Sequence, residues 1–256
     1  MGNSARLSQH FLEDEAARQA IVAAVRPAGR RVLEIGPGRG ALSEPLLEGG
    51  AALTAVELDD RLCEGLRPLL GRGLRLIHAD FLTLDLGRLG QGPYAVVSNL
   101  PYAVASPILR RLLDWSGWSE AVLMFQKEVA LRVCAAPGGA DYGLLSLAAQ
   151  IKAEPEWLFE LPPSAFRPPP RVTSGVIRLR RRAEPLVSSE EEPGFFRLAR
   201  EAFAQRRKMA ASSLSRALSR PRSEVERLLE GRGVSARARP QDIPLAVWIA
   251  LSRERR

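Results

Sequence analysis

The stretch Arg30–Gly40, RRVLEIGPGRG, joins a short run of β-formers to three closely spaced glycines. Apolar residues follow it from about Leu42 to Leu47 and predict a helix. Glycines between a strand and a helix let the polar groups of a ligand approach the backbone amides of the turn, which side chains would otherwise block. The stretch therefore predicts an α/β sheet that binds a ligand at the end of this strand.

The same alternation of strand and helix extends along the chain on both sides of this stretch. A helix is predicted over Asp14–Val25, and further strands are predicted within segments 52–60, 74–82, 94–102 and 120–133, the last passing into a helix. Helices are also predicted over 62–70 and 108–113. Alternation of this kind indicates a mostly parallel sheet covered on both faces. From about Leu144, two strand-like runs around a proline cluster predict an antiparallel pair that completes the sheet.

The C-terminal part of the chain differs in composition. Residues 183–194, AEPLVSSEEEPG, are acidic and contain proline, which predicts a linker. The segments 195–218, 223–233 and 244–254 beyond it have helical periodicity. We therefore expect an α/β domain over residues 1–183 and a small, all-helical domain over residues 184–256.

The basic residues are concentrated in this C-terminal part. The chain has a formal net charge of +8 and a pI of about 10.4, and residues from Arg178 onward carry +9 whereas the first 177 carry −1. This asymmetry predicts a polyanionic partner, nucleic acid before membrane, because no basic amphipathic helix with an aromatic face accompanies it. The alternative is a solvated arginine-rich surface, since the chain has only three lysines.

Several protein classes are not expected. No apolar run reaches the roughly 18 to 20 residues of a membrane span, and the start of the sequence has no signal-peptide core, so we expect a cytoplasmic protein. The two cysteines, Cys63 and Cys134, lack metal-site spacing and are expected to be buried thiols. The two histidines, His10 and His78, share no motif, so no metal is expected.

Three successive strand ends carry the features of a cofactor site. Gly36 and Gly38 lie in the first turn, and Glu57 follows about twenty residues later, where a carboxylate can accept both hydroxyls of a ribose. These features fit a nicotinamide dinucleotide and S-adenosylmethionine equally well. Asp80, which can accept from an adenine amino group, and Pro37, which replaces the longer glycine spacing of a pyrophosphate cradle, favour S-adenosylmethionine. Taken singly, each residue could instead make a tight turn or cap a helix.

The fourth strand ends in Asn99-Leu100-Pro101-Tyr102, where Pro101 forces Leu100 to be extended. This strand end is expected beside the methyl group of S-adenosylmethionine. Methylating an exocyclic amine of a base is difficult, because the nitrogen lone pair is delocalised into the ring. The Asn99 side-chain oxygen and the Leu100 carbonyl could accept its hydrogens, while Tyr102 stacks on the base. Such a site needs no metal or strong base, since alignment and electrostatics suffice. Alternatively, Asn99 caps the next helix and Tyr102 belongs to the core.

Blocks of sequence across nearly the whole chain resemble the KsgA family of small-subunit ribosomal RNA adenine dimethyltransferases. They include SQHFLED, VLEIGPGRGALSEPLL, AVELD, NLPYAVASPIL, MFQKEVALRV, YGLLSL, PPSAFRPPPRVTSGVIRL and FAQRRK. The resemblance implies a Rossmann-like, S-adenosylmethionine-dependent methyltransferase domain (1–183) and a helical, basic RNA-binding domain (184–256). It also implies transfer of two methyl groups to each of two adjacent adenosines near the 3′ end of 16S rRNA in the small ribosomal subunit, by a monomer, during ribosome biogenesis.

The resemblance also assigns roles to individual residues. It implies cofactor contacts from His10, Leu12, Gly36, Glu57, Asp80 and Asn99. It further implies that Phe166 stacks on the adenine opposite Tyr102. From spacing alone, Arg206, Arg207 and Lys208 follow Phe203 on a predicted helix, and the last two can share a face with Arg197 and Arg200 along an RNA backbone.

Two other functions remain open from the sequence. One is a related resistance-type methyltransferase that acts on a single adenine of large-subunit RNA; QKEVA and YGLLSL favour the small-subunit type instead. The other is a ribosome-assembly or transcription factor that binds RNA without catalysis. The intact glycine turn, Glu57, Asp80 and the NLPY motif argue against it, because a pure binding protein has no need of them.

Overall fold

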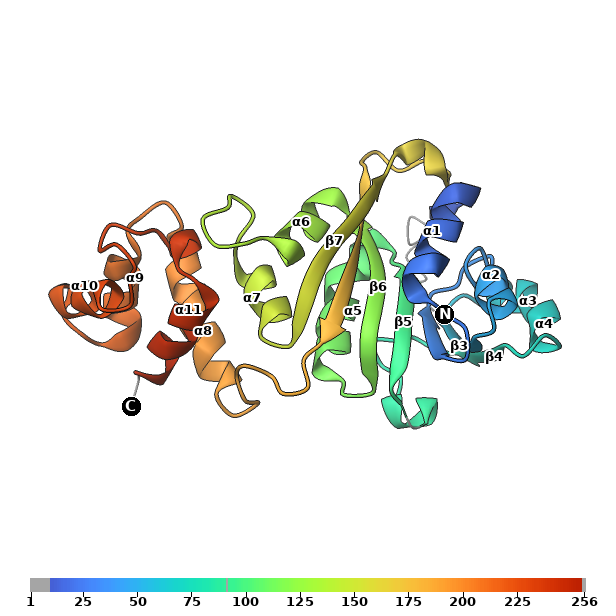
Figure 1. Cartoon of the computed structure of the whole chain (residues 1–256), viewed down its shortest axis with the longest axis horizontal. Helices are drawn as coiled ribbons and strands as arrows, with labels where there is room; N and C mark the ends of the chain where they lie inside the picture. Colours follow the sequence, from blue (N-terminus) through green and yellow to red (C-terminus); the bar gives the residue numbers. More distant parts are fainter. Residues whose placement is uncertain (1–9, 91, 255–256) are drawn as a thin grey trace, which may run out of the picture. The chain divides into compact units, whose positions relative to one another are not determined.

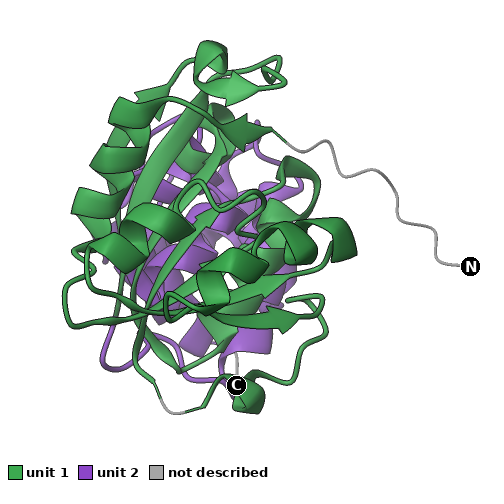
Figure 2. Cartoon of the chain, turned by 90° about the vertical axis from the view of Figure 1, so that its right-hand side faces the viewer, with its two compact units in different colours: residues 1–130, 154–181 green, residues 131–153, 182–256 purple. Residues whose placement is uncertain are grey.

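The computed structural model describes residues 10–90 and 92–254, which form two compact units (Figure 2). The first unit contains the chain up to residue 130 and residues 154–181, and the second contains residues 131–153 and the chain from 182 onward. The division differs from the expected boundary after residue 183 in two respects, because the second unit begins at residue 182 and also contains residues 131–153. Residues 131–153, expected in the α/β domain, cluster with the C-terminal helices.

The first unit is built on a seven-stranded, mostly parallel sheet with the order β4-β3-β2-β5-β6-β9-β7 (Figure 1). Its strands are β2 (Arg31–Ile35), β3 (Ala52–Glu57), β4 (Arg75–His78), β5 (Tyr94–Asn99), β6 (Trp118–Gln126), β7 (Ala153–Leu161) and β9 (Ser174–Arg181). In this order, the neighbouring strands β4, β3, β2, β5 and β6 pair in parallel, and β9 pairs antiparallel with β6. The predicted α/β class is thereby confirmed.

A second, two-stranded antiparallel sheet joins distant parts of the first unit. It pairs β1 (Phe11–Leu12) with β8 (Phe166–Arg167), with Leu12 opposite Phe166. The helices of this unit are α1 (Glu15–Val25), α2 (Ser43–Glu48), α3 (Asp60–Gly65), α4 (Arg67–Leu70) and α5 (Ala105–Asp114), and α6 (Lys127–Cys134) follows β6. The helix expected over 62–70 is therefore two helices, the second of which carries Pro68 in its first turn, where the missing N–H is tolerated.

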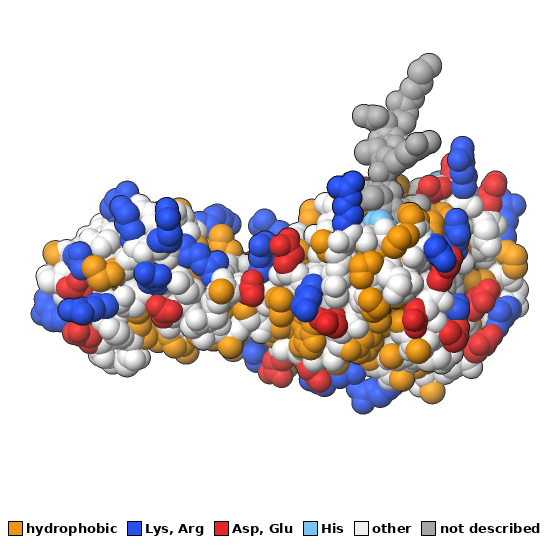
Figure 3. Space-filling model, turned by 90° about the horizontal axis from the view of Figure 1, so that it is seen from above, with side chains coloured by type: hydrophobic (Ala, Val, Ile, Leu, Met, Phe, Trp, Pro, Cys, Tyr) orange, Lys and Arg blue, Asp and Glu red, His pale blue; other side chains and the backbone are white. Residues whose placement is uncertain are grey.

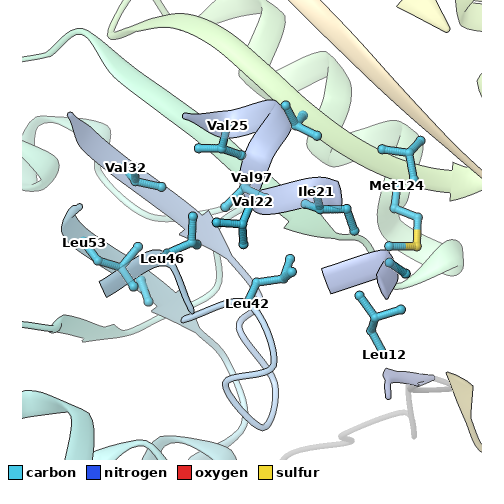
Figure 4. Close-up of a cluster of buried hydrophobic side chains, with 14 of the residues drawn as sticks. Leu12, Ile21, Val22, Val25, Val32, Leu42, Leu46, Leu53, Val97 and Met124 are labelled. Carbon is cyan, nitrogen blue, oxygen red and sulfur yellow. The ribbon is translucent and has the colours of Figure 1, made fainter. Parts of the chain in front are cut away.

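The core of the first unit explains why α1 forms and where it packs. Asp14 caps the helix by accepting a hydrogen bond from the Ala17 amide at 2.8 Å. Ile21, Val22 and Val25 recur at helical spacing and are buried against the sheet (Figure 4). Burying each such side chain contributes about 1.5 to 3 kcal/mol. This packing fixes the strands whose ends carry the site.

The second unit is helical and has its own core around Trp248 and Phe195. Its helices are α7 (Leu144–Gln150), α8 (Glu192–Phe203), α9 (Ala210–Leu218), α10 (Arg222–Glu230) and α11 (Leu245–Arg253). The segment from Leu144 thus begins with a helix before β7. Residues 183–194 are not a free linker, because Val187 is 1% exposed in this core. No helix in the described ranges is long and apolar enough to cross a membrane.

Two further expectations are wrong, one about the length of a helix and one about the burial of the cysteines. The helix expected over 195–218 stops at Phe203, and residues 204–209, here called the basic turn, separate α8 from α9. Arg207 and Lys208 therefore do not share a helix face with Arg197 and Arg200. The two cysteines are free, as expected, but both are only partly buried.

Candidate active site

A cavity lies at the carboxyl ends of β2, β3, β4 and β5. Its lining includes most of the site residues predicted from the sequence, namely His10, Leu12, Gly36, Gly38, Glu57, Asp80, Asn99, Leu100, Pro101 and Tyr102. These residues meet because parallel strands in register end at one edge of the sheet, with Ile35 beside Val56 and Glu57 beside His78. The predicted site residues of the first unit that line this cavity thus form one site in space.

The glycine turn shapes one wall of the cavity. Gly36 and Gly38 have φ angles of +66° and +60°, which L side chains rarely adopt. A Cβ at Gly36 would meet no atom within 4 Å, so this glycine faces open space within the cavity. A Cβ at Gly38 would come within 3.2 Å of the Phe11 ring. The turn therefore keeps one backbone face open and lets β1 pack closely on the other.

Glu57 is 5% exposed and is held in place by backbone amides. Its Oε1 accepts hydrogen bonds from the amides of Leu58 at 2.8 Å and Asp59 at 2.9 Å, and its Oε2 accepts from the amide of Gly38 at 3.0 Å. A carboxylate has about four acceptor sites, so capacity remains for a ligand hydroxyl. The same side chain thus ties the glycine turn to the end of β3 and presents a fixed anion to the cavity.

Asp80 is positioned two residues beyond the end of β4. Its Oδ1 accepts a hydrogen bond from the Leu82 amide at 2.8 Å. Its Oδ2 has no partner among the described residues. Asp80 can therefore accept a hydrogen bond from an amino group in the cavity, as its position in the sequence suggested.

Asn99 and Leu100 provide two further acceptors. The Asn99 Nδ2 donates to the His10 carbonyl at 3.0 Å, and because a carbonyl can only accept, this bond fixes which end of the amide is the nitrogen. The Asn99 Oδ1 and the Leu100 carbonyl accept no hydrogen bond from the residues that the structure describes. Pro101, with φ −58° and ψ 123°, is extended and fixes the direction of the chain after Leu100.

Tyr102 is half-buried beside these acceptors. Its hydroxyl lies 2.7 Å from the Ser174 hydroxyl, and its ring centroid lies 5.7 Å from that of His10 at an interplanar angle of 33°. His10 Nδ1 lies 2.7 Å from the Pro168 carbonyl, to which it must donate. Burial raises the pKa of Tyr102, and the bond to Ser174 opposes this shift. Tyr102 is therefore a neutral phenol at neutral pH.

Glu34 is a cavity residue to which the sequence assigned no role. It is 2% exposed and accepts a hydrogen bond from the Ser43 hydroxyl at 2.5 Å. Burial raises its pKa to about 7, the Ser43 bond opposes the shift, and the charge of Glu57 adds to it. Its place before the glycines was the available signal, but the sequence could not show that the side chain turns inward. The sequence also assigned no role to Ser174, because it could not show that this side chain points toward Tyr102.

Phe166 is not brought into this site. It is 1% exposed and belongs to the hydrophobic cluster that contains Leu12, Leu161 and Ala165. It does not contribute to the cavity lining. In this arrangement neither face of the Phe166 ring is open to a base, because the ring fills the core behind the β1–β8 pair.

The basic turn belongs to the second unit, and its three basic side chains differ in their contacts. The Arg206 guanidinium donates to the carbonyls of Ala140 and Tyr142, the latter at 2.9 Å. The side chains of Arg207 and Lys208 are exposed and make no hydrogen bond or ion pair with any described residue. On the face shown in Figure 3, Lys and Arg side chains gather over the C-terminal helices. Arg206 therefore supports the turn, and Arg207 and Lys208 are available to a partner.

No group of three or more His, Cys, Asp or Glu side chains that could hold a metal ion is found within residues 10–90 and 92–254.

Comparisons with known proteins agree with this geometry. Residues 2–250 match the family described as ribosomal RNA adenine dimethylase. The chain belongs to this family. It is 41% identical over 250 residues to ribosomal RNA small subunit methyltransferase A of Desulfitobacterium hafniense, covering 96% of this chain and 90% of the relative. It is 44% identical over 223 residues to the protein of that name from Thiobacillus denitrificans, covering 86% and 87%.

A solved structure of the 23S rRNA methyltransferase ErmE is also similar, with a TM-score of 0.77 and 28% identity over 96% of this chain and 99% of that one. The predicted family and Rossmann-like methyltransferase fold are thus confirmed. The cofactor of this family of ribosomal RNA adenine dimethylases is S-adenosylmethionine, and the cavity fits it. Gly36 leaves room along the backbone, Glu57 offers a fixed acceptor to ribose hydroxyls, and Asp80 has a free oxygen for an adenine amino group.

Proposed function

We propose that the chain transfers methyl groups from S-adenosylmethionine to the exocyclic amino groups of two adjacent adenosines near the 3′ end of 16S rRNA, giving dimethyladenosines in the small ribosomal subunit during ribosome biogenesis. The observation that carries the proposal is the pair of unpaired acceptors, the Asn99 Oδ1 and the Leu100 carbonyl, on the cavity that Glu57 and Asp80 also line. The small-subunit methyltransferases at 41% and 44% identity support the choice of RNA.

The residues of the chain have separate tasks in this reaction. S-adenosylmethionine, when bound, supplies an electrophilic methyl group and leaves a neutral thioether. Asn99 and Leu100 accept the two amino hydrogens of the adenine, which localises the nitrogen lone pair and aligns it for attack. Tyr102 stacks on the base that they hold. We assign stacking to Tyr102 and not to Phe166, because Phe166 is enclosed in the core.

The same residues explain why no strong base is needed. The product ammonium is more acidic than an ordinary amine, because its nitrogen is attached to the purine ring, so its proton can pass to water. Tyr102 remains protonated, since burial raises its pKa, and it therefore acts through its ring. Catalysis rests on acceptors that are oriented before the substrate arrives.

Arg207 and Lys208 are proposed to bind RNA phosphates, which need positive charge but little orientation. Arg206 contributes by fixing the backbone of the basic turn. We also propose that the enzyme acts as a monomer. Because its proposed substrate is a ribosomal subunit, we propose that the enzyme acts in the cytoplasm.

The direct test is methyl transfer from labelled S-adenosylmethionine to undermethylated small subunits, followed by mapping of the modified bases. We expect dimethylation of two adjacent adenosines near the 3′ end of 16S rRNA. Modification of a single adenosine in large-subunit RNA would instead identify a resistance-type enzyme. Tight binding of the subunit without transfer would identify a non-catalytic RNA-binding protein.

A further inference from the structure

Ser174 lies at the start of β9 and is fully buried, although neither the motifs nor the proposed chemistry gives it a role. Its backbone is fixed in the sheet, where it pairs with Gln126 of β6. Its hydroxyl lies 2.7 Å from the Tyr102 hydroxyl, and this is its only side-chain hydrogen bond within the described residues. A buried polar group is therefore committed to one partner on the cavity wall.

We propose that Ser174 is a positioning residue that holds the Tyr102 ring at the angle required for stacking on the target adenine. The inference rests on the proposed function, in which Tyr102 stacks on the base. Tyr102 is held at two places: Ser174 anchors the hydroxyl end, and the His10 ring lies against its side at a centroid distance of 5.7 Å. His10 is itself fixed by its bond to the Pro168 carbonyl.

The physical basis is the cost of ordering a side chain on binding. A tyrosine on a short helical turn can rotate about its side-chain bonds, and immobilising such a side chain costs free energy when the base arrives. The turn that carries Tyr102, residues 102–104, is a single short 3-10 segment. A hydrogen bond to a buried residue whose backbone is paired in the sheet meets this cost before the base binds. Ser174 therefore acts before binding and does not touch the base.

The alternative is that Ser174 only stabilises the sheet. The backbone pairing of β9 with β6 does not use the Ser174 side chain, so replacement by alanine preserves it. A sheet-stabilising role would act regardless of which residue occupies position 102. A positioning role acts only while position 102 carries a hydroxyl. The two roles can therefore be separated by combining substitutions at both positions.

The experiment compares Ser174→Ala, Tyr102→Phe and the double variant. Their methylation of undermethylated small subunits is measured under conditions that give kcat and KM. We expect each single variant to lower kcat/KM by about three- to tenfold, as for the loss of one hydrogen bond, and the double variant to match the single ones. Cofactor affinity should remain that of the parent. Ser213→Ala, which removes another buried hydroxyl bonded only to backbone, should leave kcat/KM unchanged.

A second measurement reports stacking itself. RNA with 8-vinyladenosine at the target position keeps the 6-amino group and loses fluorescence when the base stacks, and we expect Ser174→Ala and Tyr102→Phe to quench it less than the parent. Parent-like kcat/KM for Ser174→Ala would overturn the positioning role. The same holds if adding Ser174→Ala to Tyr102→Phe lowers kcat/KM as much as it does in the parent. Either result would leave the proposed function standing. If Ser174→Ala fails to fold, a parent-like Tyr102→Phe would also overturn it. A parent that does not methylate small subunits would overturn the proposed function, and the inference with it.

Discussion

In the cavity of the first unit, the Glu57 side chain accepts three hydrogen bonds from backbone amides and the Asn99 side chain is held by one, whereas in the basic turn of the second unit the side chains of Arg207 and Lys208 make none with a described residue. The difference matches the two tasks proposed for them. An acceptor that aligns an amine must be oriented before the reaction. A cation that binds a phosphate acts mainly through its charge, and its flexible side chain can adapt. Substitutions in the two regions should therefore differ in size and in kind.

The largest effect is expected for Asn99→Ala. This variant removes an acceptor that matters most as the amine is methylated, so we expect turnover to fall by about 10² or more, with a smaller change in cofactor affinity. Single-turnover methylation of small subunits measures the effect, and a parent-like unfolding midpoint serves as the control. Near-normal turnover would reject the role of Asn99 and remove the main contrast with the basic turn.

Glu57→Ala is expected to weaken S-adenosylmethionine binding by roughly 10- to 100-fold, because charge-assisted bonds to the ribose are lost and three amides lose their acceptor. Calorimetry measures the affinity. Asp60→Ala is the matched control, since Asp60 lies on the same edge of the sheet but its side chain is 87% exposed. Unchanged affinity in Glu57→Ala would reject the ribose site, and tight binding of a nicotinamide dinucleotide would reject the cofactor.

Glu34→Gln tests the cavity through stability instead of activity. The pKa of Glu34 is about 7 in the folded chain and 4.5 when unperturbed, so the folded state holds the proton more tightly and loses stability as the pH rises through this window. The loss between about pH 5 and pH 7.5 should be roughly 2 kcal/mol. Urea unfolding at both values should show a correspondingly flatter pH dependence for Glu34→Gln. An equal pH dependence in both proteins would contradict the burial argument.

The smallest effect is expected in the basic turn. Replacing Arg207 and Lys208 with alanine should lower affinity for the small subunit severalfold and flatten the slope of log affinity against log salt by about 0.7 per lost contact. The methylated bases and the cofactor affinity should not change. Arg206→Ala should mainly lower the stability of the second unit, because it removes bonds to the carbonyls of Ala140 and Tyr142. An unchanged slope for the double variant would show that the two cations only face solvent.

The fold and the edge of the sheet that carries the site could be predicted from the sequence because they depend on local patterns. Strand periodicity and three glycines placed the turn, and the position of Glu57 and Asp80 after strands was enough to bring them to one edge. Side-chain direction could not be predicted in this way. Phe166 lies in a strand of two residues, where pairing with Leu12 and not local sequence determines which way the ring points.

The positions at which helices end are the second feature that could not be predicted from the sequence. The periodicity of segment 195–218 continues through the basic turn, so the sequence predicts one helix there. In the structure Arg206 bonds instead to carbonyls of a loop more than sixty residues earlier, and α8 ends at Phe203. Such long-range bonds to backbone carbonyls leave no local pattern. The residues that the sequence grouped as one cationic face are therefore divided by a contact it could not show.

The pairing of β1 with β8 has a consequence for the order of events during synthesis. Phe11 and Leu12 pair with residues 166–167, and the His10 ring depends on the carbonyl of Pro168. A ribosome must therefore make the chain beyond residue 168 before the wall that His10 and Phe11 contribute can close. Until then, a nascent chain can present the glycine turn, Glu57 and Asp80 but not a complete cavity. Capture of the cofactor is thus a late property of the emerging chain, acquired only after most of the sheet has been made.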